Sequence, residues 1–130
     1  MVKPAGVVAA TAAGYVLGAI WYAPPVFGNR WMAALGKTKE QLGSPATAMG
    51  LTLVTCLISA WVLAVILARA GVGSAMGGAV AGVSVGLGVY GLNLYSDSLF
   101  AGISLRLILI QAGYRASQYA LMGAILGAWK

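Results

Sequence analysis

The chain has 130 residues, of which 61% are hydrophobic and only 8% are charged. A soluble domain carries roughly a quarter charged residues, so this composition excludes an ordinary water-soluble domain. Eight Lys and Arg residues against two acids give a formal net charge of +6, which suits anionic lipid headgroups better than nucleic acid in so apolar a chain. We therefore predict an all-α integral membrane protein with membrane lipids as partners and no nucleic acid.

Charge-free segments mark the predicted membrane spans. The segments without charge are 4–29, 41–68 and 70–96, and each is longer than the ~20 residues that a helix needs to cross the hydrocarbon. A fourth segment, 107–129, is interrupted only by Arg115. We predict one transmembrane four-helix bundle over residues 1–130, with helices at about 5–24, 46–69, 74–96 and 106–129.

The connection 26–45 has a helical pattern of its own, because Phe27, Trp31 and Leu35 recur at helical spacing. This pattern favours a short amphipathic helix at the membrane interface, between the first and second spans. A loop folded back over the bundle is the alternative. Residues 38–41 have the spacing of a capping box, which predicts a further helical turn. The candidate interfacial residues are Trp21, Tyr22, Phe27, Arg30 and Trp31.

Glycines recur every four residues in the predicted spans. Small residues at this spacing let two helices approach closely, and this packing replaces the hydrophobic drive that is available in water. Such stripes serve either as a surface for a homo-oligomer or a larger membrane complex, or as packing within one bundle. The candidate packing residues are Gly14, Gly18, Gly78, Gly82, Gly86, Gly123 and Gly127.

Polar side chains of the spans gather toward the end that carries the 26–45 connection, whereas the opposite half is almost purely apolar. This asymmetry predicts a one-sided polar pocket, while a permanent aqueous channel requires polar groups along its whole length. The candidate pocket residues are Tyr90, Asn93, Asp97, Gln111, Tyr114, Arg115 and Gln118.

Arg115 is the ionisable residue inside a predicted span and is therefore a candidate functional residue. It shares one helical face with Gln111 and Gln118, and an unpaired guanidinium there could bind an anion, a lipid phosphate or a carboxylate. Alternatively, its side chain extends to Asp97 or to headgroups. Both interpretations remain open at this stage.

The residue inventory argues against catalysis. The chain has no histidine and only two acids, Glu40 and Asp97, which lie far apart in the sequence. Histidine is the commonest general base and a common metal ligand. Cys56 has no basic partner nearby in its own predicted helix to activate it, because Arg69 lies 13 positions away at the helix end. We therefore predict that the protein is not an enzyme and has no metal and no cofactor.

Two segments resemble a known family. The first half contains GAIWY at 18–22, FG at 27–28, WM at 31–32 and LG at 35–36, and the last helix contains IQAGYR at 110–115 and MGAILGAW at 122–129. These motifs resemble domain-of-unknown-function family 1761. The resemblance implies a four-helix bacterial membrane protein, in the inner membrane as a multi-pass chain. In that family an acid and a histidine often occupy the positions of Gln111 and Arg115, so the resemblance gives no support to proton or metal chemistry here.

Two classes of function are compatible with this sequence. The first is a non-catalytic accessory or scaffold subunit that packs through its helices and holds lipid, an anion or a cofactor in the pocket near Arg115. The second is a small transporter or channel for an anionic solute, formed by a dimer. The first is favoured, because a one-sided pocket is a poor pathway. Lys and Arg are spread over both ends of the predicted spans and favour neither orientation.

Overall fold

The computed structural model describes residues 2–129, and every regular element in that part of the chain is a helix, as predicted. In chain order the elements are α1 (Pro4–Trp21), the π-helix η1 (Pro24–Gly28), α2 (Asn29–Leu35), α3 (Lys39–Leu42), α4 (Ala46–Arg69), α5 (Ala75–Val83), the π-helix η2 (Ser84–Gly91), α6 (Leu92–Ala101) and α7 (Leu105–Ala128).

Three helices have the length and the hydropathy of membrane spans. They are α1, α4 and the continuous helix Ala75–Ala101, which α5, η2 and α6 form together. The remaining long helix, α7, has 24 residues like α4, but its arginines and glutamines make it less apolar, and it is not among the three. Three of the four predicted spans are therefore compatible with a membrane by length and composition.

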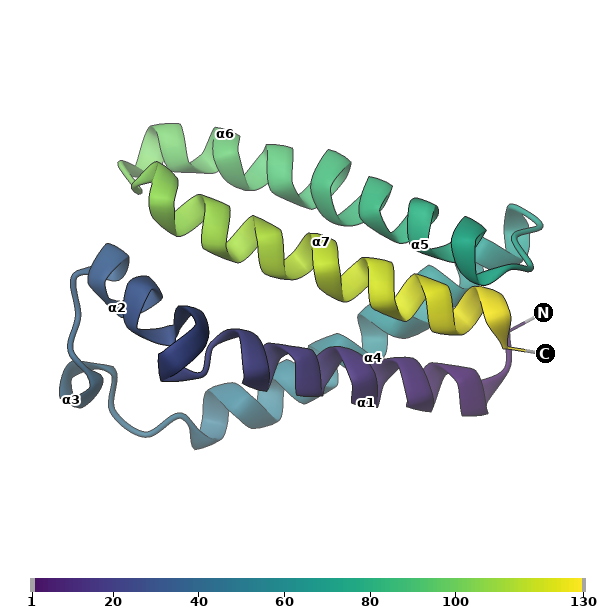
Figure 1. Ribbon diagram of the computed structural model, residues 1–130, viewed down its shortest axis with the longest axis horizontal. Helices are drawn as coiled ribbons and strands as arrows, with labels where there is room; N and C mark the ends of the chain where they lie inside the picture. The colour runs from purple at the N-terminus through teal and green to yellow at the C-terminus, as the bar shows by residue number, and fades with distance from the viewer. Residues whose placement is uncertain (1, 130) are drawn as a thin grey trace.

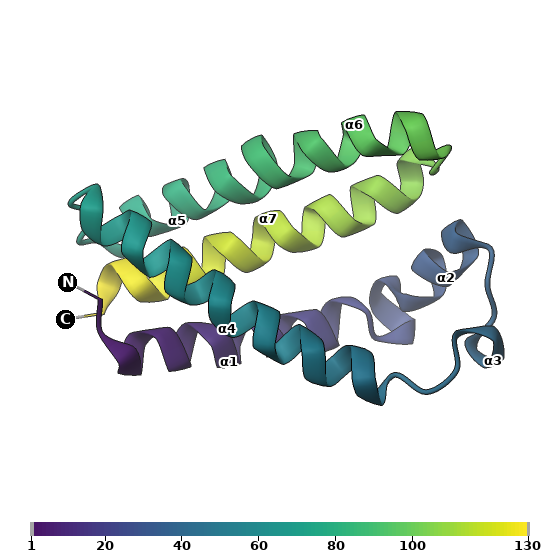
Figure 2. The same cartoon turned by 180° about the vertical axis from the view of Figure 1, so that it is seen from behind.

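The least apolar long helix lies in the middle of the bundle. The helix Ala75–Ala101 runs antiparallel along one side of α7, and α1 and α4 pack on its other side (Figures 1 and 2). The start of α1 and the end of α7 meet at one end of the bundle, here called the terminal end. Helices α2 and α3 lie at the opposite end, here called the α2 end (Figure 1).

The third long helix ends later than predicted. It was expected to stop near residue 96, before the charge of Asp97, but it continues to Ala101. The residue that stops it is Gly102, which has a φ of 72° and donates its N–H to the carbonyl of Ser98. A left-handed glycine is a common helix terminator, whereas the exposed Asp97 reaches solvent from the last turn without breaking the helix.

The first helix ends three residues earlier than predicted, at Trp21. Pro24 then opens η1, where a missing N–H costs nothing because the first turn has no partner for it. The carbonyl of Ala23 accepts the N–H of Gly28 at 3.0 Å. A Cβ at Gly28 would overlap the carbonyl of Tyr22, so this turn requires glycine.

The 26–45 connection is helical, as its pattern predicts. The seven-residue α2 packs against η1 and α7. The capping box predicted for residues 38–41 is confirmed. The Thr38 side chain accepts the N–H of Gln41 at 3.3 Å, while the Thr38 N–H donates to Oε1 of Gln41 at 2.8 Å.

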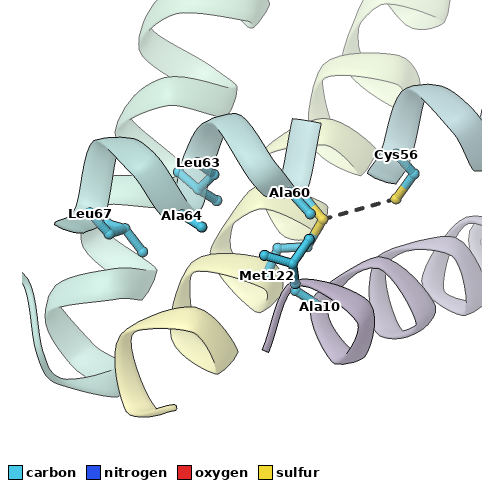
Figure 3. Close-up of a cluster of buried hydrophobic side chains, with 8 residues drawn as sticks. Ala10, Cys56, Ala60, Leu63, Ala64, Leu67 and Met122 are labelled. Carbon is cyan, nitrogen blue, oxygen red and sulfur yellow. Dashed lines mark hydrogen bonds between the residues drawn. The ribbon is translucent and has the colours of Figure 1, made fainter. Parts of the chain in front are cut away.

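The apolar core lies between α1, α4 and α7. Met122 of α7 is fully buried at its centre, facing Ala10 of α1 and Ala60 of α4, and its Sδ lies 4.0 Å from Sγ of Cys56 (Figure 3). Leu63 and Leu67 continue the same face of α4 toward the terminal end (Figure 3). The buried stripe of α4 begins at Cys56, so residues 46–55 of this helix contribute no buried residue.

Helices α5 and α7 approach so closely that their backbones touch. A Cβ on Gly78 would overlap the carbonyl of Gly123, and the reverse substitution would overlap the carbonyl of Gly78. A Cβ on Gly82 would overlap the carbonyl of Tyr119, and one on Gly127 that of Ser74. These glycines therefore pack within one chain, which is one of the two uses that their spacing allows.

Of the other predicted packing glycines, Gly14 and Gly18 make room for side chains, whereas Gly86 lies against backbone. Gly14 lies against Met122, and Gly18 lies against the hydroxyl of Tyr114. Gly86 of η2 faces the carbonyl of Arg115 on α7. The glycines thus set the distance of both α1 and η2 from the central helix.

Candidate functional site

Three polar side chains of α7 form a hydrogen-bonded chain inside the bundle. Nη1 of Arg115 donates to Oε1 of Gln118 at 2.8 Å, and Nε2 of Gln118 donates to the hydroxyl of Tyr114 at 2.9 Å. Gln118 and Tyr114 are 1% and 4% exposed. The i, i+3 and i, i+4 spacings on one helix bring the three together.

The same chain of bonds reaches two neighbouring helices. The Tyr114 hydroxyl donates to the carbonyl of Gly14 on α1 at 3.4 Å. Nε2 of Gln118 also lies 3.5 Å from Sγ of Cys56 on α4, whose thiol donates to the carbonyl of Thr11 at 3.6 Å. We call the set Thr11, Cys56, Tyr114, Arg115 and Gln118 the α7 network. It ties α1, α4 and α7 together through groups that would otherwise be buried without partners.

Arg115 is held by aromatic rings as well as by Gln118. Its Cζ lies 4.8 Å from the ring centroid of Tyr114 and 5.9 Å from that of Tyr90 on η2. A guanidinium over an aromatic face is stabilised by the quadrupole of the ring. The half-buried Arg115 is therefore fixed inside the bundle, and the bond that it makes runs to Gln118 rather than to Asp97.

The remaining predicted pocket residues lie apart from the α7 network. The exposed Asn93 donates to the carbonyl of Val89 in its own helix at 2.6 Å. Asp97 is exposed near the end of α6, and the half-buried Gln111 lies one turn before Arg115 on α7. Of the seven predicted pocket residues, the structure brings together Tyr90, Tyr114, Arg115 and Gln118.

The predicted interfacial residues form an aromatic cluster that packs on the bundle. Trp21 stacks on Phe27 with centroids 4.7 Å apart. Tyr22 meets the edges of Trp31 and Tyr114 at 5.7 Å and 5.3 Å. The Trp21 indole also donates to the carbonyl of Ile110 on α7 at 3.1 Å. Arg30 lies over the outer side of the cluster, with its Cζ 5.9 Å from the Phe27 ring centroid.

The two tryptophans of this cluster differ in one hydrogen bond and allow a matched test. Trp21 Nε1 has a carbonyl partner, whereas Trp31 Nε1 is buried with none. We expect Trp21→Phe to lower the free energy of unfolding by about 1 kcal/mol more than Trp31→Phe, because only the first removes a formed bond. Reversible unfolding in mixed micelles measures both, and an equal loss would contradict the assignment.

Sequence reasoning missed the roles of Thr11 and Cys56. Cys56 was interpreted as a small hydrophobic residue, and its buried position agrees with that. Its contact with Gln118 joins residues 62 positions apart, which no spacing rule relates. The signal in the sequence that could have linked Cys56 to Tyr114 and Gln118 was their similar depth along the predicted helices, toward the centre of the bundle.

Arg115 lines neither of two cavities that lie at the ends of the bundle. One, of about 190 Å³, lies at the terminal end beside Lys3 and Trp129. The other, of about 520 Å³, lies at the α2 end between Arg30 and Arg106. Within residues 2–129 no three His, Cys, Asp or Glu side chains come together as metal ligands. The chemistry of the α7 network is therefore that of one cation and neutral hydrogen-bonding groups.

The fold and this network define an all-helical protein with apolar helices of membrane-spanning length. Residues 5–127 match the profile of a family described as Protein of unknown function (DUF1761). The chain belongs to this family, as its glycine and aromatic motifs predict. A search of curated proteins and a search of solved structures each found no match to the chain.

Proposed function

We propose that the chain is a non-catalytic, multi-pass protein of the bacterial inner membrane that acts as a helix-packing scaffold or accessory subunit. Four spans are proposed, with α7 as the fourth. Its polar side chains Tyr114 and Gln118 turn inward, while Leu109 and Leu121 face outward. A helix with a polar face is acceptable in lipid when that face is covered by the bundle.

The observation that carries this proposal is that the polar side chains of α7 and the glycines of α5 and α7 make contacts within the bundle. Arg115, Gln118 and Tyr114 bond to one another, and the glycines of α5 and α7 close the interface between these two helices. Side chains and glycines that hold helices together make the bundle rigid, which suits a scaffold better than a protein that must bind and release a solute. The chain also has no histidine, the residue most often used as a general base.

The N-terminal part of α4, residues 46–58, is the proposed contact surface for other membrane helices. Leu51, Val54 and Ile58 are each more than half exposed, and no residue before Cys56 in this helix is buried. A contiguous apolar face is typical of a protein or lipid contact. Its occupant is a second copy of the chain or a larger membrane complex, and at the α2 end η1 and α2 are proposed to lie along the headgroups.

A second candidate function, transport of an anionic solute, is favoured by one specific observation. Arg115 lies against Tyr90 in the π-helical segment η2, and π-helical turns inside longer helices are frequent at functional sites. A transporter would use Arg115 to attract the solute.

Substitution of Arg115 separates the two functions. For a scaffold we expect Arg115→Leu to leave the oligomeric state unchanged. We also expect proteoliposomes that contain the wild type or Arg115→Leu to pass chloride and phosphate no faster than empty vesicles. Native mass spectrometry and a flux assay measure these outcomes. Flux in the wild type that Arg115→Leu abolishes and Arg115→Lys partly restores would overturn the scaffold in favour of transport.

A further inference from the structure

The cavity at the α2 end combines two cations with an apolar wall. Its volume is about 520 Å³, within the ~300–1,000 Å³ range of ligand pockets. It lies between η1, α2 and the first turns of α7. The lining residues are Phe27, Arg30, Leu105, Arg106, Leu109 and Ile110.

The electrostatics of this cavity favour an anion. Arg30 is anchored beside the ring of Phe27, and Arg106 stands in the first turn of α7, whose N-terminus adds a partial positive charge. The two acids of the chain, Glu40 and Asp97, are not among its lining residues. Two guanidiniums that line one cavity can bind a phosphate through their paired N–H groups.

The wall of the cavity argues for a lipid rather than a free anion. Leu105 and Leu109 are each more than half exposed and lie one turn apart on α7, so an apolar track leads from the arginines along the helix. A free phosphate would make no contact with this apolar track, whereas an acyl chain would cover it and remove apolar surface from water or headgroups.

We propose that this cavity binds an anionic phospholipid, with its phosphate between Arg30 and Arg106 and an acyl chain along Leu105 and Leu109. This lipid site rests on the proposed membrane function, because that function places Arg30 and Arg106 at the depth of the lipid headgroups. Cations at that depth attract anionic lipid. The scaffold would thereby carry a bound lipid at the seam between α2 and α7.

The test measures lipid retained by the purified protein. Native mass spectrometry in detergent, with equal amounts of phosphatidylglycerol and phosphatidylcholine added, is expected to show preferential retention of phosphatidylglycerol. Each arginine-to-glutamine change should reduce that preference about fivefold, so Arg30→Gln combined with Arg106→Gln should abolish it. The matched control is Lys37→Gln, an exposed cation of the same region outside the cavity, which should leave the preference unchanged.

Three results would overturn the lipid site. Equal retention of both lipids, an equal loss in Lys37→Gln, or inorganic phosphate that displaces the lipid at equal concentration would each do so, the last by showing a free-anion site. Extraction with alkaline carbonate keeps the two proposals distinguishable. If carbonate removes the chain from membranes, the proposed membrane function is wrong. If the chain stays in the membranes but shows no lipid preference, only the proposed lipid site is wrong.

Discussion

Replacing Gly82 with leucine is expected to destroy the folded bundle. A Cβ at this position overlaps the backbone carbonyl of Tyr119 on α7, and a carbonyl cannot rotate away as a side chain can. Helices α5 and α7 would have to separate, which also opens the contact between Gly78 and Gly123. Overpacking a core costs about 1–3 kcal/mol when side chains can adjust, so we expect a loss above about 3 kcal/mol, seen as aggregation or a collapsed melting transition in detergent.

The same long helix supplies a matched control. A Cβ at Gly88 meets nothing within 4 Å, and this glycine is exposed. We therefore expect Gly88→Leu to fold with a melting temperature close to that of the wild type. If Gly82→Leu instead folded normally and only shifted an oligomer to a monomer, the glycine stripe would be a surface between copies, and the packing described above would be wrong.

The glycines show how far sequence can predict membrane packing. Their four-residue spacing indicates a face for close approach, but Gly78, Gly82 and Gly86 would present the same face to a second copy as to α7 of their own chain. The partner depends on which helices the turns bring together. The short turn at 102–104, which begins at the left-handed Gly102, places α7 beside the helix Ala75–Ala101, and spacing alone contains no such information.

The predicted helix bounds were most accurate where a proline or glycine next to the helix marks its end. The bounds of α4 agree with the prediction because a proline precedes it and glycines follow it. The third helix was predicted too short because charge was used as its boundary, whereas Gly102 is the residue that ends it. α7 was predicted as a span from the segment 107–129, which only Arg115 interrupts. The place of α7 at the centre of the bundle explains how this helix accommodates Arg115 and Gln118.

The candidate site was predictable only within one helix. Arg115 and Gln118 share a face of α7 by spacing, and the structure joins them by a hydrogen bond. Asn93 and Asp97 were grouped with them by depth, but depth does not define rotation about the helix axis, and both side chains are exposed on α6. Contacts between helices, such as that of Cys56, depend on crossing geometry that one sequence does not encode in its spacing.

Gln118→Leu is expected to cost about 2 kcal/mol of unfolding free energy. The amide is 1% exposed and serves both Arg115 and Tyr114, so leucine leaves a half-buried guanidinium without its acceptor. Hydrogen bonds between membrane helices average only ~0.6 kcal/mol, but loss of a partner from a charged group costs more. The measurement is unfolding of the protein in bicelles, with Gln111→Leu as the control. That glutamine lies on the same helix outside the α7 network, and its replacement should cost less than about 0.5 kcal/mol.

A double-mutant cycle then isolates the bond itself. Removing the cation as well, in Arg115→Leu combined with Gln118→Leu, should recover about 1 kcal/mol relative to the sum of the single losses, because no unpartnered guanidinium remains. Residues that share a hydrogen bond are coupled, whereas distant residues are additive. Additive losses would show that Arg115 and Gln118 do not depend on each other, and would leave Arg115 free to act on a ligand rather than to hold α7 in place.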